Sequence, residues 1–136
     1  MKIEHIAMYV SDLEKTKAFY EKYFGARANT KYHNPKTGLM TYFLSFETGC
    51  RLEIMCKPDI AGVDRAKEHM GYAHLAVAVA GKEGVDGLTN RLRNDGFAVL
   101  SEPRTTGDGY YESCVCDPEG NRIEIVAGMK RSKTYV

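Results

Sequence analysis

Four residues of the chain have side chains that suit a divalent metal ion: the histidines His5 and His74 and the glutamates Glu53 and Glu124. Neutral imidazole nitrogens and carboxylate oxygens are common ligands of Zn²⁺ and related ions. Two neutral imidazoles and two carboxylates balance the charge of such an ion, whereas two buried carboxylates without a partner are costly. The residue types therefore predict one divalent metal ion per site, able to act as a Lewis acid.

These residues occur at matching places of an internal repeat. Residues 5–10 align with 74–79 at an offset of 69 residues, and 49–55 align with 120–126 at an offset of 71. Seven of the 13 aligned positions are identical. Each half therefore begins with a segment that carries His and ends with one that carries Glu, which indicates a duplicated module.

The alternation of side chains along a strand separates the four candidates from the apolar residues of their segments. In each segment, His or Glu shares a face with smaller or mixed neighbours, and large aliphatic residues occupy the opposite face. The aliphatic residues are Ile6, Met8 and Val10, then Leu52 and Ile54, then Leu75, Val77 and Val79, and finally Ile123 and Ile125. We expect these to pack under helices and the other faces to line a small-molecule site.

Each half has room for one helix after its first strand. In the first half, Ser11 or Asp12 caps a helix that begins near Leu13 and ends at Gly25. In the second half, apolar residues at helical spacing within 85–92 predict the corresponding helix.

Strands complete each module. The expected strands are 28–33, 40–46 and 51–55 in the first half, and 97–102, 110–116 and 122–126 in the second. The chain thus predicts an α+β domain of residues 1–127 made of two β-α-β-β-β modules, 1–56 and 73–127. Residues 57–72 join them, with a short helix expected at 63–70, and 128–136 form a polar tail.

Composition excludes several classes of protein. The 136 residues are 43% hydrophobic and 27% charged, with a net charge of +1, which is typical of a globular domain. The balanced charge argues against nucleic acid, and the lack of a long apolar stretch argues against a membrane partner. The N-terminal apolar run is interrupted by Glu4 and His5, so we predict no signal peptide. None of the four cysteines forms a C-x-x-C pair. Together with the expected lack of a signal peptide, this cysteine pattern favours a location in the reducing cytoplasm.

The chain resembles the vicinal oxygen chelate superfamily and, within it, the glyoxalase I (lactoylglutathione lyase) branch. The resemblance extends from His5 to about Ala127 and rests on H-x-A-x-x-V at residue 5, DLEKTKAFYEKYFG from residue 12, residues 71–77, and DPEGNRIEIV from residue 117. It implies that the two modules form a cup-shaped mixed sheet. It also implies a homodimer, since two chains often complete each site in this superfamily.

The resemblance maps the four metal positions of the family onto His5, Glu53, His74 and Glu124. Fosfomycin-resistance and extradiol dioxygenase members use two His and one Glu, and bleomycin-binding members lack the set, so the second Glu favours a glyoxalase-type site. The implied activity is a metal-dependent lyase that isomerises a hemithioacetal, formed from a 2-oxoaldehyde and a thiol, to a 2-hydroxyacyl thioester. Glu124 is the leading catalytic base and Glu53 the second candidate.

Two positions depart from the branch. Glyoxalase I usually has Arg four residues after its first ligand and Asn four residues after its second, where this chain has Tyr9 and Lys57. We predict that both bind substrate, with Lys57 as a point charge for a carboxylate. The thiol and the metal (Zn, Ni, Co or Mn) stay open, as do two other functions: a different metal enzyme such as an epimerase or thiol transferase, and a non-catalytic binding protein.

Overall fold

The structure is a computed structural model that describes residues 1–128, so the predicted polar tail lies outside the described residues from position 129 onward. The chain divides into two compact units, Met1–Lys67 and Glu68–Val136. The two units are called the first and the second unit below, and each is described by itself.

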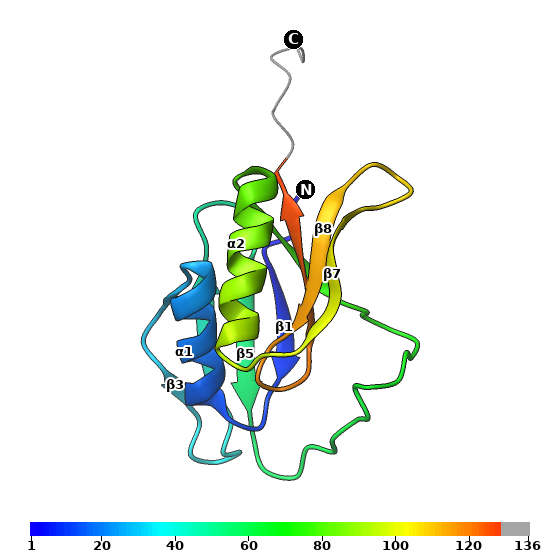
Figure 1. Ribbon diagram of the computed structural model, residues 1–136. Coiled ribbons are helices and arrows are strands. Elements are labelled where there is room, and N and C mark those ends of the chain that lie inside the picture. Colours follow the sequence, from blue (N-terminus) through cyan, green and yellow to red (C-terminus); the bar gives the residue numbers. More distant parts are fainter. Residues whose placement is uncertain (129–136) are drawn as a thin grey trace. The chain divides into compact units, whose positions relative to one another are not determined.

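The first unit is a mixed sheet with one helix. Its elements are β1 (His5–Tyr9), α1 (Leu13–Phe24), β2 (Arg27–Ala28), β3 (Tyr32–His33), β4 (Met40–Ser45) and β5 (Arg51–Cys56). The strand order is β1-β5-β4-β2, and β3 also pairs with β4. Strand β1 runs parallel to β5 (Figure 1). Strand β4 runs antiparallel to β5. Strand β1 therefore lies at an edge of its sheet.

The second unit repeats this topology. Its described elements are β6 (Leu75–Val79), α2 (Gly81–Asn94), β7 (Val99–Thr105), β8 (Tyr111–Cys116) and β9 (Arg122–Ala127). Their order is β6-β9-β8-β7, with β6 parallel to β9 and β8 antiparallel to it. Edge strand β6 thus corresponds to β1, and β9 corresponds to β5. The predicted α+β class and the two β-α-β-β-β modules are confirmed, with the described strands in two mixed sheets.

Local sequence explains where the helices begin and end. Asp12 caps α1, because its carboxylate accepts a hydrogen bond of 3.0 Å from the backbone N–H of Lys15. Gly25 ends this helix in the left-handed conformation. Helix α2 lacks a side-chain cap and packs on β7, β8 and β9, while its first turn lies close to Val79 at the end of β6. A Cβ atom on Gly84 would lie 3.2 Å from Cγ2 of Val79, so glycine permits that close approach.

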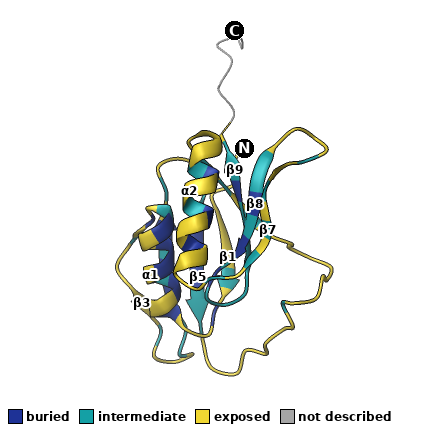
Figure 2. Cartoon of the chain, in the orientation of Figure 1, coloured by how far each residue is buried: buried dark blue, intermediate teal, exposed yellow. Residues whose placement is uncertain are grey.

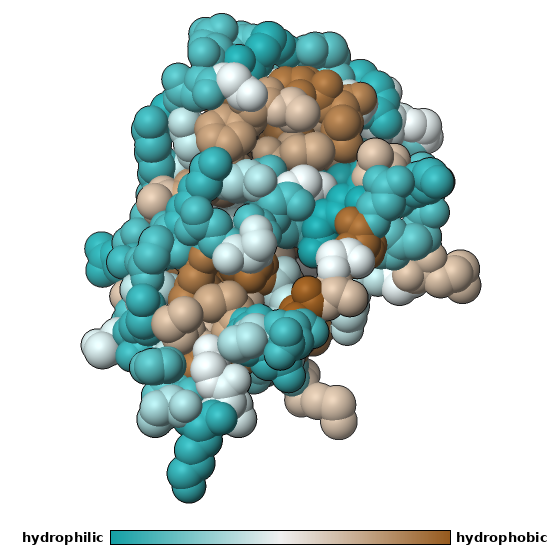
Figure 3. Space-filling model, turned by 90° about the horizontal axis from the view of Figure 1, so that it is seen from below, coloured by the Kyte–Doolittle hydropathy of each residue, from teal (hydrophilic) through white to brown (hydrophobic). Residues whose placement is uncertain are grey.

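The helices cover the aliphatic faces of the inner strands β5 and β9. Leu52 and Ile54 on β5, and Ile123 and Ile125 on β9, are buried (Figure 2). Ile6 is 39% exposed, because β1 is an edge strand and α1 packs on β2, β4 and β5. The expectation for the aliphatic faces is thus confirmed for β5 and β9. For the segments 6–10 and 75–79 it is confirmed only in part: Val10 is buried and Ile6 is exposed, while the half-buried residues are Met8, Leu75, Val77 and Val79. Figure 3 shows further apolar residues at the surface, in patches between hydrophilic ones.

The structure corrects two details of the predicted elements. Residues 28–33 form two short strands rather than one, because Asn29 interrupts the ladder: its side-chain Oδ1 accepts a hydrogen bond of 2.8 Å from the backbone N–H of Phe43. The expected helix at 63–70 is absent. Val63 is 53% and Met70 97% exposed, so this segment has no packed face to stabilise so short a helix.

Replacing Tyr42 with Phe is expected to destabilise the first unit by about 1–2 kcal/mol, because a buried hydroxyl that donates to a carboxylate is lost. Tyr42 is 7% exposed, and its hydroxyl lies 2.9 Å from Oε1 of Glu14. The hydrogen bond from Lys31 is the main cause that lowers the pKa of Glu14, followed by that of Tyr42. Chemical denaturation measures the change in the free energy of unfolding.

The effect of Tyr42→Phe depends on pH in a defined direction. The pKa of Glu14 is lower in the folded state, so its contribution is present above the ordinary carboxyl pKa and disappears as the pH falls through the lowered one. We therefore expect the difference between the two proteins to shrink in acid. Tyr32→Phe is the matched control, since Tyr32 is 53% exposed. Equal destabilisation by both substitutions would contradict the assignment.

Candidate metal and active site

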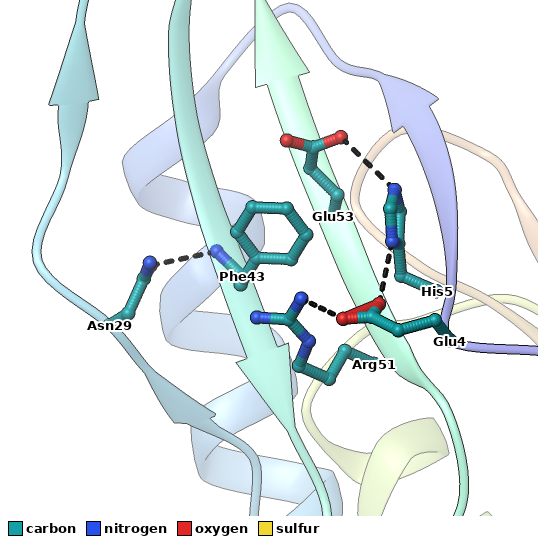
Figure 4. Close-up of polar contacts among 6 residues, drawn as sticks. All are labelled: Glu4, His5, Asn29, Phe43, Arg51 and Glu53. Carbon is teal, nitrogen blue, oxygen red and sulfur yellow. Dashed lines mark hydrogen bonds and ion pairs between the residues drawn. The ribbon is translucent and has the colours of Figure 1, made fainter.

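The first unit places one histidine and one glutamate of the predicted set side by side. In the parallel pairing of β1 with β5, His5 is opposite Arg51 and Ala7 is opposite Glu53, so all four residues share a face of the sheet. The Nε2 atom of His5 lies 3.9 Å from Oε1 of Glu53 (Figure 4). The side chain of His5 is 40% exposed and that of Glu53 is 17% exposed, so the pair is accessible.

The second unit repeats this arrangement. His74 directly precedes β6, and the register pairs Ala76 of β6 with Glu124 of β9, as Ala7 pairs with Glu53. The Nε2 atom of His74 lies 3.2 Å from Oε2 of Glu124. These side chains are 40% and 26% exposed. The duplication therefore preserves the spatial relation of His to Glu as well as the residue types.

The donor atoms of each pair fit a shared divalent ion. Bonds from such an ion to nitrogen or oxygen are about 2.0–2.2 Å long, which places two neighbouring ligands about 3–3.5 Å apart. The distance between the two donor atoms in the second unit lies in this range. In the first unit, Nε2 of His5 and Oε1 of Glu53 must move slightly closer to each other to bind one ion. Among residues 1–128, no group of three or more His, Cys, Asp or Glu side chains is gathered for a metal ion. Each unit thus presents two of the four predicted ligands.

Sequence reasoning missed the surroundings of His5. The Nδ1 atom of His5 lies 2.7 Å from Oε2 of Glu4, and Glu4 also forms an ion pair with Arg51. The hydrogen bond with His5 is the first cause that lowers the pKa of Glu4, and the bond with Arg51 is the second. The guanidinium of Arg51 lies 4.1 Å from the centre of the Phe43 ring. The signals were present in the sequence, because Glu4 adjoins His5 and Arg51 recurs as Arg122.

Besides the predicted Glu53 and Glu124, the structure places one more carboxyl group at the site, beside Glu124, which the sequence analysis did not predict. Glu112 on β8 is opposite Val126 on β9, and its side chain hydrogen-bonds that of Glu124. Burial is the main cause that raises the pKa of Glu112, and the bond to Glu124 and the charges of Glu124 and Asp108 act in the same direction. The one signal that could have identified Glu112 is its position on a strand paired with β9, on the same face as Glu124.

The predicted substrate residues lie together in the first unit. Tyr9, at the end of β1, is 38% exposed, and the Nζ atom of Lys57 lies 5.6 Å from the centre of its ring. Since Tyr9 shares the face of His5 and Ala7 along the strand, an exposed aromatic ring and a cation adjoin the pair formed by His5 and Glu53.

The remaining histidines and the cysteines are not among the predicted ligands, although Cys114 is opposite Glu124 on the paired strand. His33 and His69, which lack a counterpart in the repeat, are exposed. The cysteines, Cys50, Cys56, Cys114 and Cys116, are free. Burial is the main cause that raises the pKa of the Cys114 and Cys116 thiols, which keeps them protonated near neutral pH.

Comparison with known proteins identifies a family model and several relatives that match most of this chain. The family model described as Glyoxalase/Bleomycin resistance protein/Dioxygenase superfamily matches residues 2–125. An uncharacterized protein of Bacillus subtilis, YqjT, is 27% identical over 92% of this chain and 98% of its own length. A lactoylglutathione lyase of Haemophilus influenzae is also 27% identical, over 93% of this chain and 92% of the relative.

Solved structures share the fold. Glyoxalase I from Zea mays aligns with a TM-score of 0.78 at 22% identity over 95% of this chain, which spans 45% of the maize protein. This likeness supports the fold alone. In the described part of the chain, no helix has the length and apolar character needed to span a membrane.

Proposed function

Because the chain belongs to the glyoxalase/bleomycin resistance protein/dioxygenase superfamily, we propose that it is a metal-dependent enzyme of the glyoxalase I type. Its reaction converts the hemithioacetal of a 2-oxoaldehyde and a thiol into a 2-hydroxyacyl thioester. The observation that carries the proposal is the pair of His and Glu side chains that each unit holds, with separations of 3.9 Å and 3.2 Å.

The two pairs together form the proposed metal site. His5 and His74 bind through neutral imidazole nitrogens, and Glu53 and Glu124 bind through carboxylate oxygens. Zn, Ni, Co and Mn all accept this set of nitrogen and oxygen ligands. When bound, the ion supplies a Lewis acid that stabilises negative charge on two neighbouring substrate oxygens.

Glu124 is the proposed base. Its carboxylate removes the proton from the carbon that carries sulfur and returns it to the adjacent carbon, while the hydroxyl proton passes to the former carbonyl oxygen. Atoms and electrons balance, because the product is an isomer of the hemithioacetal. Glu53 is the second candidate for this role. Ile123 and Ile125, the neighbours of Glu124 on β9, are buried on the opposite face of the strand, which limits the movement of the backbone that carries Glu124.

We further propose that the protein is a homodimer in which the two pairs of one site come from different chains. Both pairs involve an edge strand, β1 in the first unit and β6 in the second. An edge strand has unpaired backbone groups on one side, and β1 also leaves Ile6 39% exposed. We take the free edges of β1 and β6 as the places where another module joins each pair.

The proposed substrate lies along β1 beyond the metal site. Tyr9 provides an aromatic surface for the carbon skeleton, and Lys57 binds a carboxylate of the thiol. Lys57 is a point charge rather than a two-pronged donor, so thiols with a carboxylate at different positions are acceptable substrates.

Removing the metal is expected to lower activity by about 100-fold or more, since a bound metal contributes several kcal/mol of charge stabilisation in the transition state. Protein loaded with each of the four metals is mixed with methylglyoxal and a panel of thiols, and thioester formation is followed. A chelator should lower the rate by this factor, and added metal should restore it.

Other outcomes distinguish the rival functions. Turnover of acyl thioesters without isomerisation of any hemithioacetal would indicate an epimerase, and opening of an epoxide by a thiol would indicate a transferase. Purified protein that binds methylglyoxal adducts without metal or turnover would indicate a binding protein.

A further inference from the structure

We propose that Glu4 is a positioning residue for His5: its carboxylate holds the proton of the imidazole on Nδ1 and thereby presents an unprotonated Nε2 to the metal. The inference rests on the proposed function, because it assigns Nε2 of His5 to the metal site.

Distances around His5 place the proton. A neutral imidazole carries one N–H. The hydrogen bond that one ring nitrogen makes determines which of the two nitrogens carries the proton. Nδ1 lies 2.7 Å from Oε2 of Glu4, within hydrogen-bond reach. Nε2 lies 3.9 Å from Oε1 of Glu53, beyond hydrogen-bond reach. The carboxylate of Glu4 therefore accepts the Nδ1–H, and the lone pair of Nε2 faces Glu53 (Figure 4).

A closed ring of contacts holds Glu4 in this place. Its carboxylate pairs with the guanidinium of Arg51, and its backbone carbonyl accepts a hydrogen bond of 3.0 Å from the backbone N–H of Arg51. Arg51 lies over the ring of Phe43, and the edge of that ring meets the imidazole of His5 at a centroid distance of 5.2 Å. Contacts on two sides thus restrict the rotation of the imidazole.

The described part of the second unit, residues 68–128, lacks this arrangement, so duplication alone does not account for it. Ala73 precedes His74, where Glu4 precedes His5. Cys114 is opposite Glu124, where Phe43 is opposite Glu53. Arg122, the counterpart of Arg51, lies 3.8 Å from Glu68. Ligand histidines that donate their second N–H to a carboxylate are oriented and made more basic, so His5 is the better prepared of the two.

The test compares Glu4→Ala with the unchanged protein in two ways. Nitrogen NMR of the metal-free protein, at a pH where imidazoles are neutral, should find the His5 proton on Nδ1 in the unchanged protein and moved toward Nε2 in the variant. Competition with a chelating dye should show an affinity for Zn²⁺ that is about 10–100-fold weaker in the variant. Glu4→Gln keeps an acceptor oxygen and should restore part of both properties.

Glu68→Ala is the matched control. It removes the carboxylate near Arg122 without touching either histidine, and both readouts should stay unchanged. A Glu4→Ala protein with lower thermal stability but an unchanged His5 tautomer would overturn the proposal, since Glu4 would then only join strands. Tight Zn²⁺ binding by the unchanged protein with equal binding by Glu4→Ala overturns the role of Glu4 alone. Failure of the unchanged protein to bind any divalent ion overturns the proposed function and this role together.

Discussion

Replacing Glu124 with Gln is expected to lower turnover by about 10²–10⁴-fold, the usual contribution of a positioned general base. The amide has nearly the same shape as the carboxylate and does not accept the proton from carbon. The fold should be retained, because Glu124 is 26% exposed at its side chain and its neighbours Ile123 and Ile125 stay buried. The measurement is kcat for thioester formation from a preformed hemithioacetal, together with the metal content of the variant.

Two further variants make the result interpretable. Glu53→Gln tests the second candidate for the base, and the larger loss of kcat at equal metal content identifies the base. Glu47→Gln makes the same chemical change at an exposed loop position and should leave kcat unchanged. Full isomerase activity of Glu124→Gln would show that the assignment of the base is wrong. Loss of bound metal in Glu124→Gln would confirm its proposed role as a ligand and would mean that the lower kcat does not identify the base.

Mixed dimers of two inactive variants are expected to recover about half of the normal activity if each site combines two chains. His5→Ala removes a ligand of the first unit, and Glu124→Ala removes the base of the second. In a symmetric dimer with shared sites, one site of the mixed dimer carries both defects and the other carries neither. Co-expression with two different affinity tags isolates the mixed dimers, whose kcat is compared with that of each variant alone.

The opposite arrangement gives a different result. If both pairs of a site came from the same chain, each site of the mixed dimer would contain one defect, and activity would stay at the level of the separate variants. Mixed dimers of His5→Ala with Glu53→Ala are the matched control. Both substitutions affect the first unit, so every site keeps a defect in either arrangement.

The sequence predicted most of the elements, since these depend on local patterns. The alternation of Leu52, Glu53 and Ile54 marks a strand with one buried face, and the structure buries Leu52 and Ile54. The sequence left Ser11 or Asp12 as the cap of α1 and Gly25 as its end, and the structure assigns the cap to Asp12 and confirms Gly25, since caps are made within one turn of the chain.

The errors arose where tertiary contacts decide. Apolar residues at 63–70 suggested a helix that finds no surface to pack on, and Met70 is 97% exposed. Asn29 ends β2 because its side chain bonds to the backbone of Phe43, 14 residues away. The metal, the shared site and the cytoplasmic location stay predictions.

By itself, the sequence determined that this protein contains a duplicated β-α-β-β-β module and that His and Glu share a face at matching strands of both copies. Repeats and strand alternation are properties of the residue order, so the amino-acid sequence alone is sufficient to identify them. Only the tertiary structure decided that the side chain of Glu4 contacts both His5 and Arg51. The contact with Arg51 depends on strand pairing, which brings Glu4 to Arg51 across 47 residues of chain. The separations of 3.9 Å and 3.2 Å likewise follow from the register of parallel strands, which no local pattern encodes.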